Sequence, residues 1–475
     1  MKNAGEKVNV LLLNVPEDLY DVSNYTSILQ NFGLAMISSV LKKHGHNVTL
    51  LDAAANGLNR NRIREYFRQL NPKILGITAM THSLNQIIDL LRDAKKFNPD
   101  VITVLGGPHP TSEYKNLLDN FPEVDIAAIG EGEYTMLEIV EKVQSKGTLE
   151  CIKGIAFRSN GTIQVNPLRE PIEDLDSLPL ADWDSLPMQK YFDRWTVKKN
   201  YALINASRGC AYSCTFCVYN FIGKRFRRRS PEIIIEEIKL LYNKYDVRHI
   251  EFSDSTLNSD NEWLKEICKG LINLKKPIFW GCEFRPDKAD LETLKLMKKS
   301  GCIHLCIGVE SADNGMLKRM KKGETIEKIG TGIRMAQEVG LNPDLGFILG
   351  MPGETKETVM KTINFAREYP KSSVTFTFAT PYSGSQLYEI AKKEGQIVDD
   401  WSKHSMHRLV YVPNTFTKEE LQNYYKLAIR SVFLRPIFIY NQILNIKSWL
   451  HFKIALRFAS RVFFKKLRWL NTSRG

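Results

Sequence analysis

Short runs of apolar and β-branched residues alternate with amphipathic stretches over residues 1–150. The runs typical of strands are residues 8–15, 47–52, 74–80, 101–107 and 126–130. Between them apolar residues recur at the spacing of a helix, as in residues 33–46 and 84–97. Strands that alternate with helical crossovers form a parallel sheet with helices on both faces. This α/β pattern predicts a Rossmann-like, doubly wound parallel sheet.

Small or flexible residues follow three of these strands. They are Thr78, the segment GGPHPT at residues 106–111, and the segment GEGE at residues 130–133. Ligands of a doubly wound sheet bind beyond the C-terminal strand ends, where glycine lets the backbone approach them closely. Any one of these loops also fits a tight turn. Three such loops at one edge of the sheet favour a ligand pocket.

The middle of the chain divides into a linker and a second domain. Residues 151–197 are rich in Pro and Asp and weakly patterned, which predicts a linker draped over the domains. Over residues 198–395 the alternation resumes, with strand-like runs at 202–207, 249–254, 278–284, 304–310, 343–350 and 374–380. Six consecutive strand–helix units fit a partial (β/α)6 barrel of the TIM type better than a second flat sheet. Its chemistry should lie at the C-terminal strand ends.

The composition is that of an ordinary globular protein. Hydrophobic residues make up 43% and charged residues 25% of the 475 residues. No apolar run reaches the roughly 18 residues that a spanning helix needs, and the N-terminus lacks the pattern of a secretory signal. We therefore expect a cytoplasmic protein, in which cysteines stay reduced.

The net charge of +13 is concentrated at the C-terminus. Residues 401–475 hold 14 Lys and Arg against two acidic residues, which leaves the first 400 residues at +1. This distribution argues against attraction to nucleic acid over the whole surface. No recognition motif accompanies the basic segment, so no nucleic-acid partner is expected.

Residues 396–475 predict a basic helical region, of which the clearest helix spans residues 448–470. Its apolar residues form one stripe, namely Trp449, Phe452, Leu456, Ala459, Phe463, Leu467 and Leu470. The cations fall mainly elsewhere, at Lys453, Arg457, Arg461, Lys465 and Arg468. Such a helix fits a membrane interface, with peripheral contact at the inner face of the membrane. It equally fits a helix docked on the barrel with a solvated basic face; both interpretations stay open.

Three of the eight cysteines crowd into the loop after the first barrel strand. Cys210, Cys214 and Cys217 have the spacing C-x3-C-x2-C. In a reducing compartment such a trio indicates metal binding or catalysis rather than disulfides. Three thiolates with one open position suit zinc or an iron–sulfur cluster. Because no fourth ligand for a closed zinc site lies nearby in the sequence, we favour the cluster.

This loop, CAYSCTFC, resembles the signature C-x3-C-x-aromatic-C of the radical S-adenosylmethionine (SAM) superfamily. The resemblance continues through GVES at residues 308–311, GFILGMPGET at 346–355 and TPYSGSQLY at 380–388. The first 150 residues, with GGPHPT and GEGE, resemble the cobalamin-binding domain that precedes this barrel in one large subgroup. The resemblance thus implies a 4Fe-4S cluster, SAM and cobalamin as cofactors.

The superfamily implies a role for each matched barrel residue. The three cysteines would ligate three irons of the cluster, and SAM would chelate the fourth. The residues matched to SAM binding are Phe216, Arg285, Glu310, Gly346, Ile348 and Gly350. Among them Phe216 would lie by the adenine, Glu310 against the ribose or amino group, and Arg285 could pair with the SAM carboxylate. A salt-bridged pair at the barrel end is the alternative for Arg285 and Glu310.

For cobalamin the resemblance points to the three loops of the first domain. The matched residues are Thr78, Gly106, Gly107, Pro108, His109, Thr111, Gly130, Glu131, Gly132 and Glu133. The D-x-H-x-x-G motif that supplies a cobalt ligand in many cobalamin domains is missing from residues 1–150. Either cobalamin binds without a protein histidine or the domain has lost it, and we favour retention because both loop motifs are intact.

Together these features imply a cobalamin-dependent radical SAM enzyme. It would cleave SAM reductively to a deoxyadenosyl radical and methylate an unactivated carbon of a small-molecule or lipid precursor. Cyclisation or oxidative rearrangement without methyl transfer is the first alternative, and an iron–sulfur and corrinoid electron-transfer protein the second. A reductant such as flavodoxin or ferredoxin is the expected protein partner.

Overall fold

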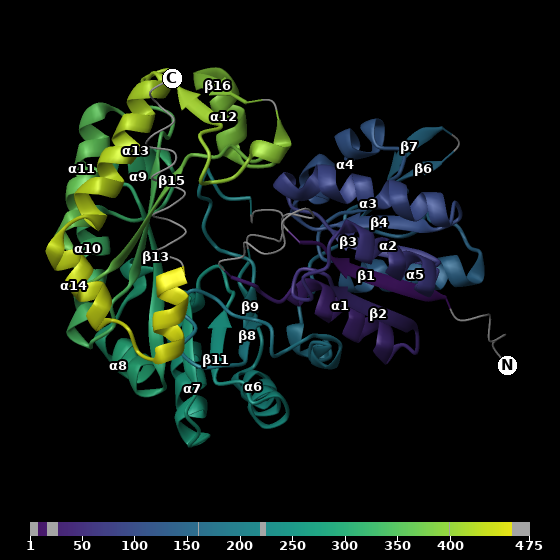
Figure 1. The fold of residues 1–475 in the computed structure, drawn as a ribbon, viewed down its shortest axis with the longest axis horizontal. Coiled ribbons are helices and arrows are strands. Elements are labelled where there is room, and N and C mark those ends of the chain that lie inside the picture. The colour runs from purple at the N-terminus through teal and green to yellow at the C-terminus, as the bar shows by residue number, and fades with distance from the viewer. Residues whose placement is uncertain (1–7, 17–26, 160, 219–224, 399, 458–475) are drawn as a thin grey trace.

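The computed structural model describes residues 8–16, 27–159, 161–218, 225–398 and 400–457, and these form an N-terminal domain beside a barrel (Figure 1). The first sheet has the strand order β2-β1-β3-β4-β5-β6-β7. Strands β1 to β5 are parallel, and β6 and β7 continue the sheet antiparallel. Its strands are β1 (Asn9–Asn14), β2 (Asn47–Asp52), β3 (Ile74–Thr78), β4 (Ile102–Gly106), β5 (Ile126–Ala128), β6 (Ile155–Ser159) and β7 (Thr162–Val165). Residues 155–165, predicted to belong to the linker, thus join this sheet.

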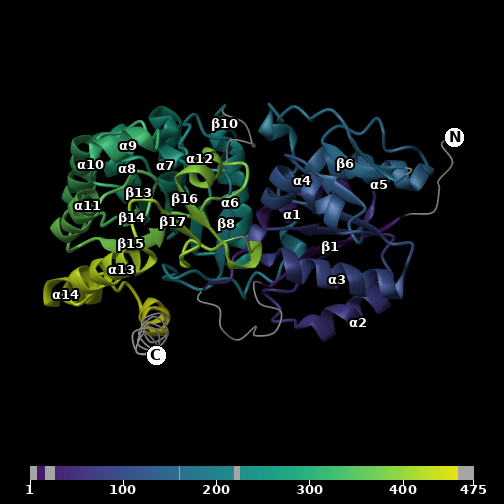
Figure 2. The same ribbon diagram turned by 90° about the horizontal axis from the view of Figure 1, so that it is seen from above.

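Helices cover both faces of this sheet, as predicted. They are α1 (Phe32–Lys43), α2 (Arg60–Leu70), α3 (Leu84–Phe97), α4 (Pro108–Asn120) and α5 (Glu133–Ser145). Alternate side chains of β1 enter different cores: Val10 and Leu12 pack with α1 and α5, whereas Leu11 and Leu13 pack with α2 and α3 (Figure 2). The period of two along the strand therefore produces two apolar layers.

The linker is fastened to the first domain rather than loosely draped. Ser38 of α1 donates a hydrogen bond to Asp182 Oδ2 at 2.6 Å. The Tyr191 hydroxyl donates to Asp52 Oδ2 at 2.7 Å, and both groups are buried. These bonds hold residues 181–191 along the side of the sheet that carries α1.

The second domain is a six-stranded parallel sheet in the order β15-β14-β13-β12-β11-β8, curved into a partial barrel (Figure 1). Its strands are β8 (Tyr201–Ile204), β11 (His249–Phe252), β12 (Phe279–Glu283), β13 (Cys302–Glu310), β14 (Asp344–Leu349) and β15 (Ser373–Phe378). The helices of this domain are α6 (Pro231–Tyr245), α7 (Asn261–Asn273), α8 (Leu291–Lys299), α9 (Asn314–Arg319), α10 (Ile326–Glu338), α11 (Lys356–Glu368) and α12 (Gln386–Glu394). The α/β fold class and both predicted sheets are therefore confirmed.

The C-terminal region wraps the outside of the barrel. It contains β16 (Gly395–Ile397), β17 (Tyr411–Pro413), α13 (Lys418–Phe433) and α14 (Pro436–Leu444). A further helical stretch covers residues 449–457. The later stripe and cation positions Ala459, Arg461, Phe463, Lys465, Leu467, Arg468 and Leu470 lie outside the described residues.

Candidate active site

The base of the cysteine loop is a short ribbon anchored by a buried carboxylate. Strand β9 (Ser207–Arg208) pairs antiparallel with β10 (Arg227–Arg228) on either side of the loop. Asp254, at the end of β11, accepts hydrogen bonds from the Ser207 hydroxyl and from the backbone N–H of Ala206 (3.1 Å). Burial raises the pKa of Asp254 to about 6, while its hydrogen bonds oppose this rise. The ribbon therefore leaves the barrel at a fixed angle.

The loop itself lies on the C-terminal end of the barrel. The backbone N–H of Thr215 donates to the Met320 carbonyl at 2.9 Å, and the N–H of Leu387 donates to the Thr215 carbonyl at 2.7 Å. The loop is thus pinned between the end of α9 and the start of α12. These bonds hold the three cysteines in place, and none of the three forms a disulfide.

Cys210, Cys214 and Cys217 all line one cavity of about 560 Å³ that descends into the barrel. Each is half-buried, so its sulfur is reachable from the cavity. Burial raises the pKa of Cys214 to about 11, and the nearby Lys322 ammonium acts against this rise. Among the described residues no three His, Cys, Asp or Glu side chains lie close enough to hold a single metal ion. Three soft sulfur donors around one cavity suit a cluster with several iron atoms.

Glu310 faces the same cavity from the end of β13. Its backbone is in the left-handed region, with φ of 66°, and its Oε1 lies 3.5 Å from Lys322 Nζ. Burial raises the pKa of the Glu310 carboxyl, and the Lys322 ammonium counteracts it. A Cβ at position 308 would lie 2.3 Å from Glu310 Oε1, so a larger residue there would displace this carboxylate. Strand geometry and Gly308 together aim this carboxylate at the cavity.

Arg285 also lines the cavity but is already engaged on all sides. Its Nε donates to Asp287 Oδ1 at 3.0 Å, and its Nη2 lies 3.4 Å from Glu324 Oε2. The guanidinium lies over the Tyr212 ring at 3.5 Å from the centroid. It does not pair directly with Glu310. Lys322 instead links the two groups, because its Nζ lies 3.5 Å from Glu310 Oε1 and 3.5 Å from Glu324 Oε2, the oxygen that also faces Arg285.

The other residues matched to SAM binding divide into two groups. Phe216 and Ile348 pack against the same apolar cluster, which includes Met320 and Tyr411, so an apolar wall continues from the cysteine loop to β14. Gly346 faces the barrel interior. Gly350 instead lies under α13, where a Cβ would come 2.7 Å from Leu421, and its N–H donates to Glu354 at 2.5 Å. Gly350 therefore shapes the turn after β14.

Deeper in the barrel the cavity is lined by ionisable groups. Glu251 Oε1 lies 3.4 Å from His304 Nδ1, and His304 stacks on Trp195 with the ring centroids 4.5 Å apart. Burial raises the pKa of Glu283 to about 7, while its hydrogen bond with Cys306 opposes this. Trp195 and His304 thus form the floor of the cavity. Because its pKa is about 7, the Glu283 carboxyl can hold a proton near neutral pH.

The loops matched to cobalamin come together at the C-terminal edge of the first sheet. Thr111 connects two of them: its hydroxyl donates to the Gly107 carbonyl at 2.8 Å and accepts from the Gly130 N–H at 3.1 Å. A Cβ at Gly107 would lie 2.6 Å from Thr78 Oγ1, whereas one at Gly130 would meet nothing within 4 Å. The loops therefore present bare backbone at the edge where doubly wound sheets bind ligands.

His109 is buried in this edge rather than free for a ligand. Its Nδ1 lies 3.3 Å from Thr81 Oγ1, and its ring meets the edge of Trp401 at 5.9 Å between centroids. Burial lowers the pKa of His109 to about 4. The imidazole is therefore neutral at physiological pH and packs the first domain against the C-terminal region.

The two glutamates of GEGE reach across to the ribbon that carries the cysteine loop. Glu131 Oε1 lies 2.9 Å from Arg227 Nη2 and 3.4 Å from Arg208 Nη1, and Glu133 pairs with Arg208. All four side chains are largely buried. The backbone N–H of Ile172 donates to Glu131 Oε2 at 2.7 Å. GEGE therefore joins the two domains at the base of the cysteine loop.

A second contact joins the domains at the other side of the barrel mouth. In TPYSGSQLY, the Ser383 hydroxyl donates to Glu113 of α4. A Cβ at Gly384 would lie 3.0 Å from Ser112 Cβ. Both contacts bring the loop edge of the first sheet against the end of the barrel that bears the cysteines.

Several of these residues carry no sequence signal of their own. Lys322 follows α9 in a run of cations typical of a solvated surface, and Arg208 and Arg227 lie 19 positions apart. Cys282 and Cys302 are buried in the barrel core, as their strand positions suggest, but Cys306 lines the cavity beside Glu283. Only the inward-pointing alternation of β12 and β13 could have indicated that pair.

Family profiles and relatives agree with this architecture. Residues 20–140 match the B12 binding domain and residues 204–366 match the Radical SAM superfamily. An uncharacterised methyltransferase of Pyrococcus horikoshii is 31% identical over 91% of this chain and 94% of its own length. The anaerobic magnesium-protoporphyrin IX monomethyl ester cyclase of Rubrivivax gelatinosus is 30% identical, over 86% of this chain and 74% of its own.

Two solved structures share the fold. The cobalamin-dependent SAM radical enzyme OxsB, with aqua-cobalamin and SAM bound, superposes with a TM-score of 0.73 at 19% identity, covering 90% of this chain and 67% of its own. The radical SAM methyltransferase TsrM of Kitasatospora setae, with cobalamin and a 4Fe-4S cluster bound, gives 0.70 at 16% identity, covering 91% and 90%. Both likenesses extend over at least 90% of this chain, so they cover the first domain as well as the barrel.

Proposed function

The chain belongs to the cobalamin-binding subgroup of the radical SAM superfamily, and we propose that it methylates an unactivated carbon of its substrate. It is a radical SAM enzyme whose cofactors are a 4Fe-4S cluster, SAM and cobalamin. When bound, these groups supply one-electron cleavage of SAM and a transferable methyl group. A one-electron reductant such as flavodoxin or ferredoxin would donate electrons to the cluster.

The residues around the cavity fit these groups. Cys210, Cys214 and Cys217 would hold the cluster, since all three line one cavity and none forms a disulfide. Glu310, held by Lys322, would accept hydrogen bonds from SAM, and the wall of Phe216 and Ile348 would pack the adenine. Arg285 pairs with Asp287 and Glu324, and its contact with the SAM carboxylate stays a prediction. The loops around Gly107 and Gly130 would carry cobalamin, with open space beside Gly130 for the ligand to approach.

One observation carries the proposal: the loop edge of the first domain is bonded to the ribbon beneath the cysteine loop. A methyl donor on that edge would face the mouth of the cavity. Methyl transfer requires this arrangement, because the donor must reach the same carbon from which hydrogen is removed. The relative from Pyrococcus horikoshii bears the name of a methyltransferase, which supports the same reaction.

Cyclisation without methyl transfer is the second candidate, since a relative at 30% identity is a cyclase. The two candidates differ in their products. Anaerobic enzyme reconstituted with all three cofactors would be given reductant, SAM with an isotopically labelled methyl group, and a cellular extract of metabolites and lipids. A methyltransferase forms S-adenosylhomocysteine and deoxyadenosine and leaves label in an extract component. Deoxyadenosine alone, without label in any product, would overturn methylation in favour of cyclisation.

A further inference from the structure

The outward face of α14 is entirely apolar. This helix, PIFIYNQIL, contains no charged residue. Phe438 alone is buried against the barrel, while the outer positions are 44 to 63% exposed; they are Ile437, Ile439, Tyr440, Ile443 and Leu444. A solvated surface helix normally turns polar residues outward. A contiguous apolar face of this size is typical of an interaction surface.

The following helical stretch continues this surface. The sequence left open whether its apolar stripe faces the barrel or the solvent. Within residues 449–457, Trp449 is 68% and Leu456 58% exposed, whereas His451 is buried and meets the edge of Trp195. Phe452 stacks on Trp449 with the centroids 5.1 Å apart. The helix therefore docks on the barrel through His451, while Trp449 and Leu456 of the stripe face outward.

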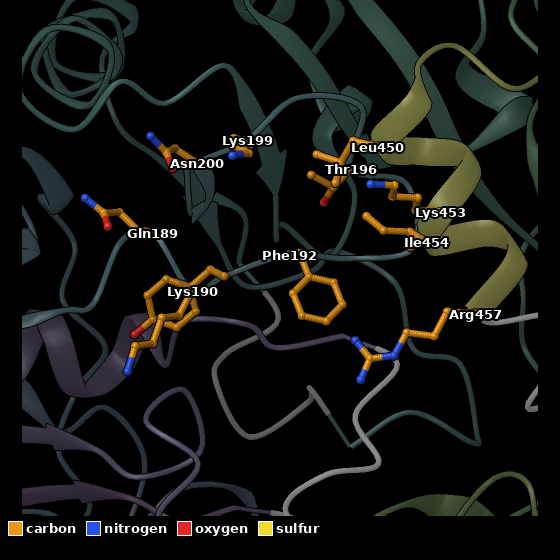
Figure 3. A pocket seen from close by; sticks show the side chains of 11 residues that line it. Gln189, Lys190, Phe192, Thr196, Lys199, Asn200, Leu450, Lys453, Ile454 and Arg457 are labelled. Carbon is orange, nitrogen blue, oxygen red and sulfur yellow. The ribbon is translucent and has the colours of Figure 1, made fainter.

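Cations gather directly beside this stripe. A cavity of about 580 Å³ lies between the linker and residues 450–457. Figure 3 shows Lys453 and Arg457 on the helix at one side of it, with Lys190 of the linker and Lys199, just after the linker, at the other. None of the described residues that line it is acidic. Residues 421–475 contain no acidic residue.

We propose that α14, residues 449–457 and this basic cavity bind the surface of an anionic lipid bilayer. The apolar side chains would enter the boundary between headgroups and acyl chains, and the four cations would contact lipid phosphates. Figure 2 shows α14 and the last described helix on the same side of the barrel, so both can reach one plane. In the described residues every helix is too short or too polar to span a bilayer. The surface is thus suited to lying on a membrane.

A second copy of the chain is the main competing occupant of this face. Two copies joined there would bring the same cation clusters close together, which is unfavourable, whereas anionic headgroups complement them. The proposal is independent of the reaction catalysed, because none of these residues lines the cysteine cavity.

Vesicle co-sedimentation of the full chain tests the proposal. We expect binding to vesicles of phosphatidylcholine mixed with phosphatidylglycerol, weaker binding to phosphatidylcholine alone, and weakening by salt. The double variant Ile439→Asp and Ile443→Asp should bind at least about tenfold more weakly. The double variant Lys199→Glu and Lys453→Glu should lose the preference for anionic vesicles. These positions are exposed or line an open cavity, so the variants should fold.

Matched controls lie elsewhere on the surface. Leu168 is 66% exposed in the linker and Lys115 is exposed on α4, so Leu168→Asp and Lys115→Glu should bind vesicles as the parent does. Equal sedimentation with and without anionic lipid would overturn the proposal. A second set of results would also overturn it. In this case light scattering finds a dimer for the parent and a monomer for the Ile439→Asp and Ile443→Asp variant, and the two proteins bind vesicles equally.

Discussion

The ion pairs between GEGE and the ribbon should contribute strongly to stability, and Glu131→Gln tests this. Glu131 accepts from Arg227 at 2.9 and 3.2 Å and from the Ile172 N–H at 2.7 Å. Its side chain is 8% exposed and that of Arg227 is 3% exposed. Glutamine preserves the shape, but its single carbonyl oxygen cannot serve all three donors, and it leaves the Arg227 charge buried and unneutralised by Glu131.

Removing one partner of a buried ion pair costs about 3 to 5 kcal/mol. We therefore expect Glu131→Gln to lower the free energy of unfolding by about that amount, measured by urea denaturation at pH 7. An exposed pair provides the control. The side chains of Glu266 and Lys269 are 57% and 54% exposed and lie 2.7 Å apart, so Glu266→Gln should cost less than about 1 kcal/mol.

A double-mutant cycle shows whether the loss arises from this pair. Arg227→Gln alone should also destabilise, because it leaves Glu131 with fewer donors. The double variant Glu131→Gln and Arg227→Gln contains neither charge, so its loss should be smaller than the sum of the single losses by at least about 1 kcal/mol. Additivity within about 0.5 kcal/mol, or a single variant as stable as the parent, would refute a buried interdomain ion pair.

Three further outcomes follow from the cavity and the loop edge. Cys214→Ala should lose its iron and the absorbance of the cluster, and it should cleave no SAM. Cys151→Ser, at an exposed cysteine outside the cavity, should keep the iron, the absorbance and the cleavage of SAM. A cluster retained in Cys214→Ala would contradict the assignment of Cys214 as a ligand. Gly308→Ala should weaken SAM binding about 10- to 100-fold in equilibrium dialysis, because its Cβ displaces the Glu310 carboxylate; unchanged affinity would separate Glu310 from SAM. Burial lowers the pKa of His109 from 6.5 to about 4, so the unfolded state binds the extra proton between these values and parent stability falls as pH falls through this window. Between pH 7 and pH 5 the free energy of unfolding, measured by urea denaturation, should therefore fall by about 2 kcal/mol less in His109→Gln than in the parent. Equal decreases in the two proteins would show that the protonation of His109 does not cause the loss.

The local pattern of residues was sufficient to predict both sheets, and the resemblance of its local motifs to a known superfamily implied the cofactors. Strand–helix alternation repeats along the chain, so each unit indicates its own structure, whereas the short strands β6, β7, β9, β10, β16 and β17 lie outside this alternation and were not predicted. The cysteine loop was equally local, since its three thiols lie within eight residues. The spacing of these thiols required no knowledge of distant residues.

Tertiary structure decided which partners the ionisable residues find. GEGE suggested a cobalamin loop, yet its carboxylates meet Arg208 and Arg227, some 75 to 96 residues away. Arg285 matched a SAM ligand, yet it holds Asp287 and Glu324. The stripe of Trp449 and Leu456 could be read from the helical period, but not the direction in which it faces. Hydrophobic periodicity depends on residues that are neighbours in the chain. A charge is instead neutralised by whichever group folding brings within a few ångströms of it, and the local sequence does not contain that information.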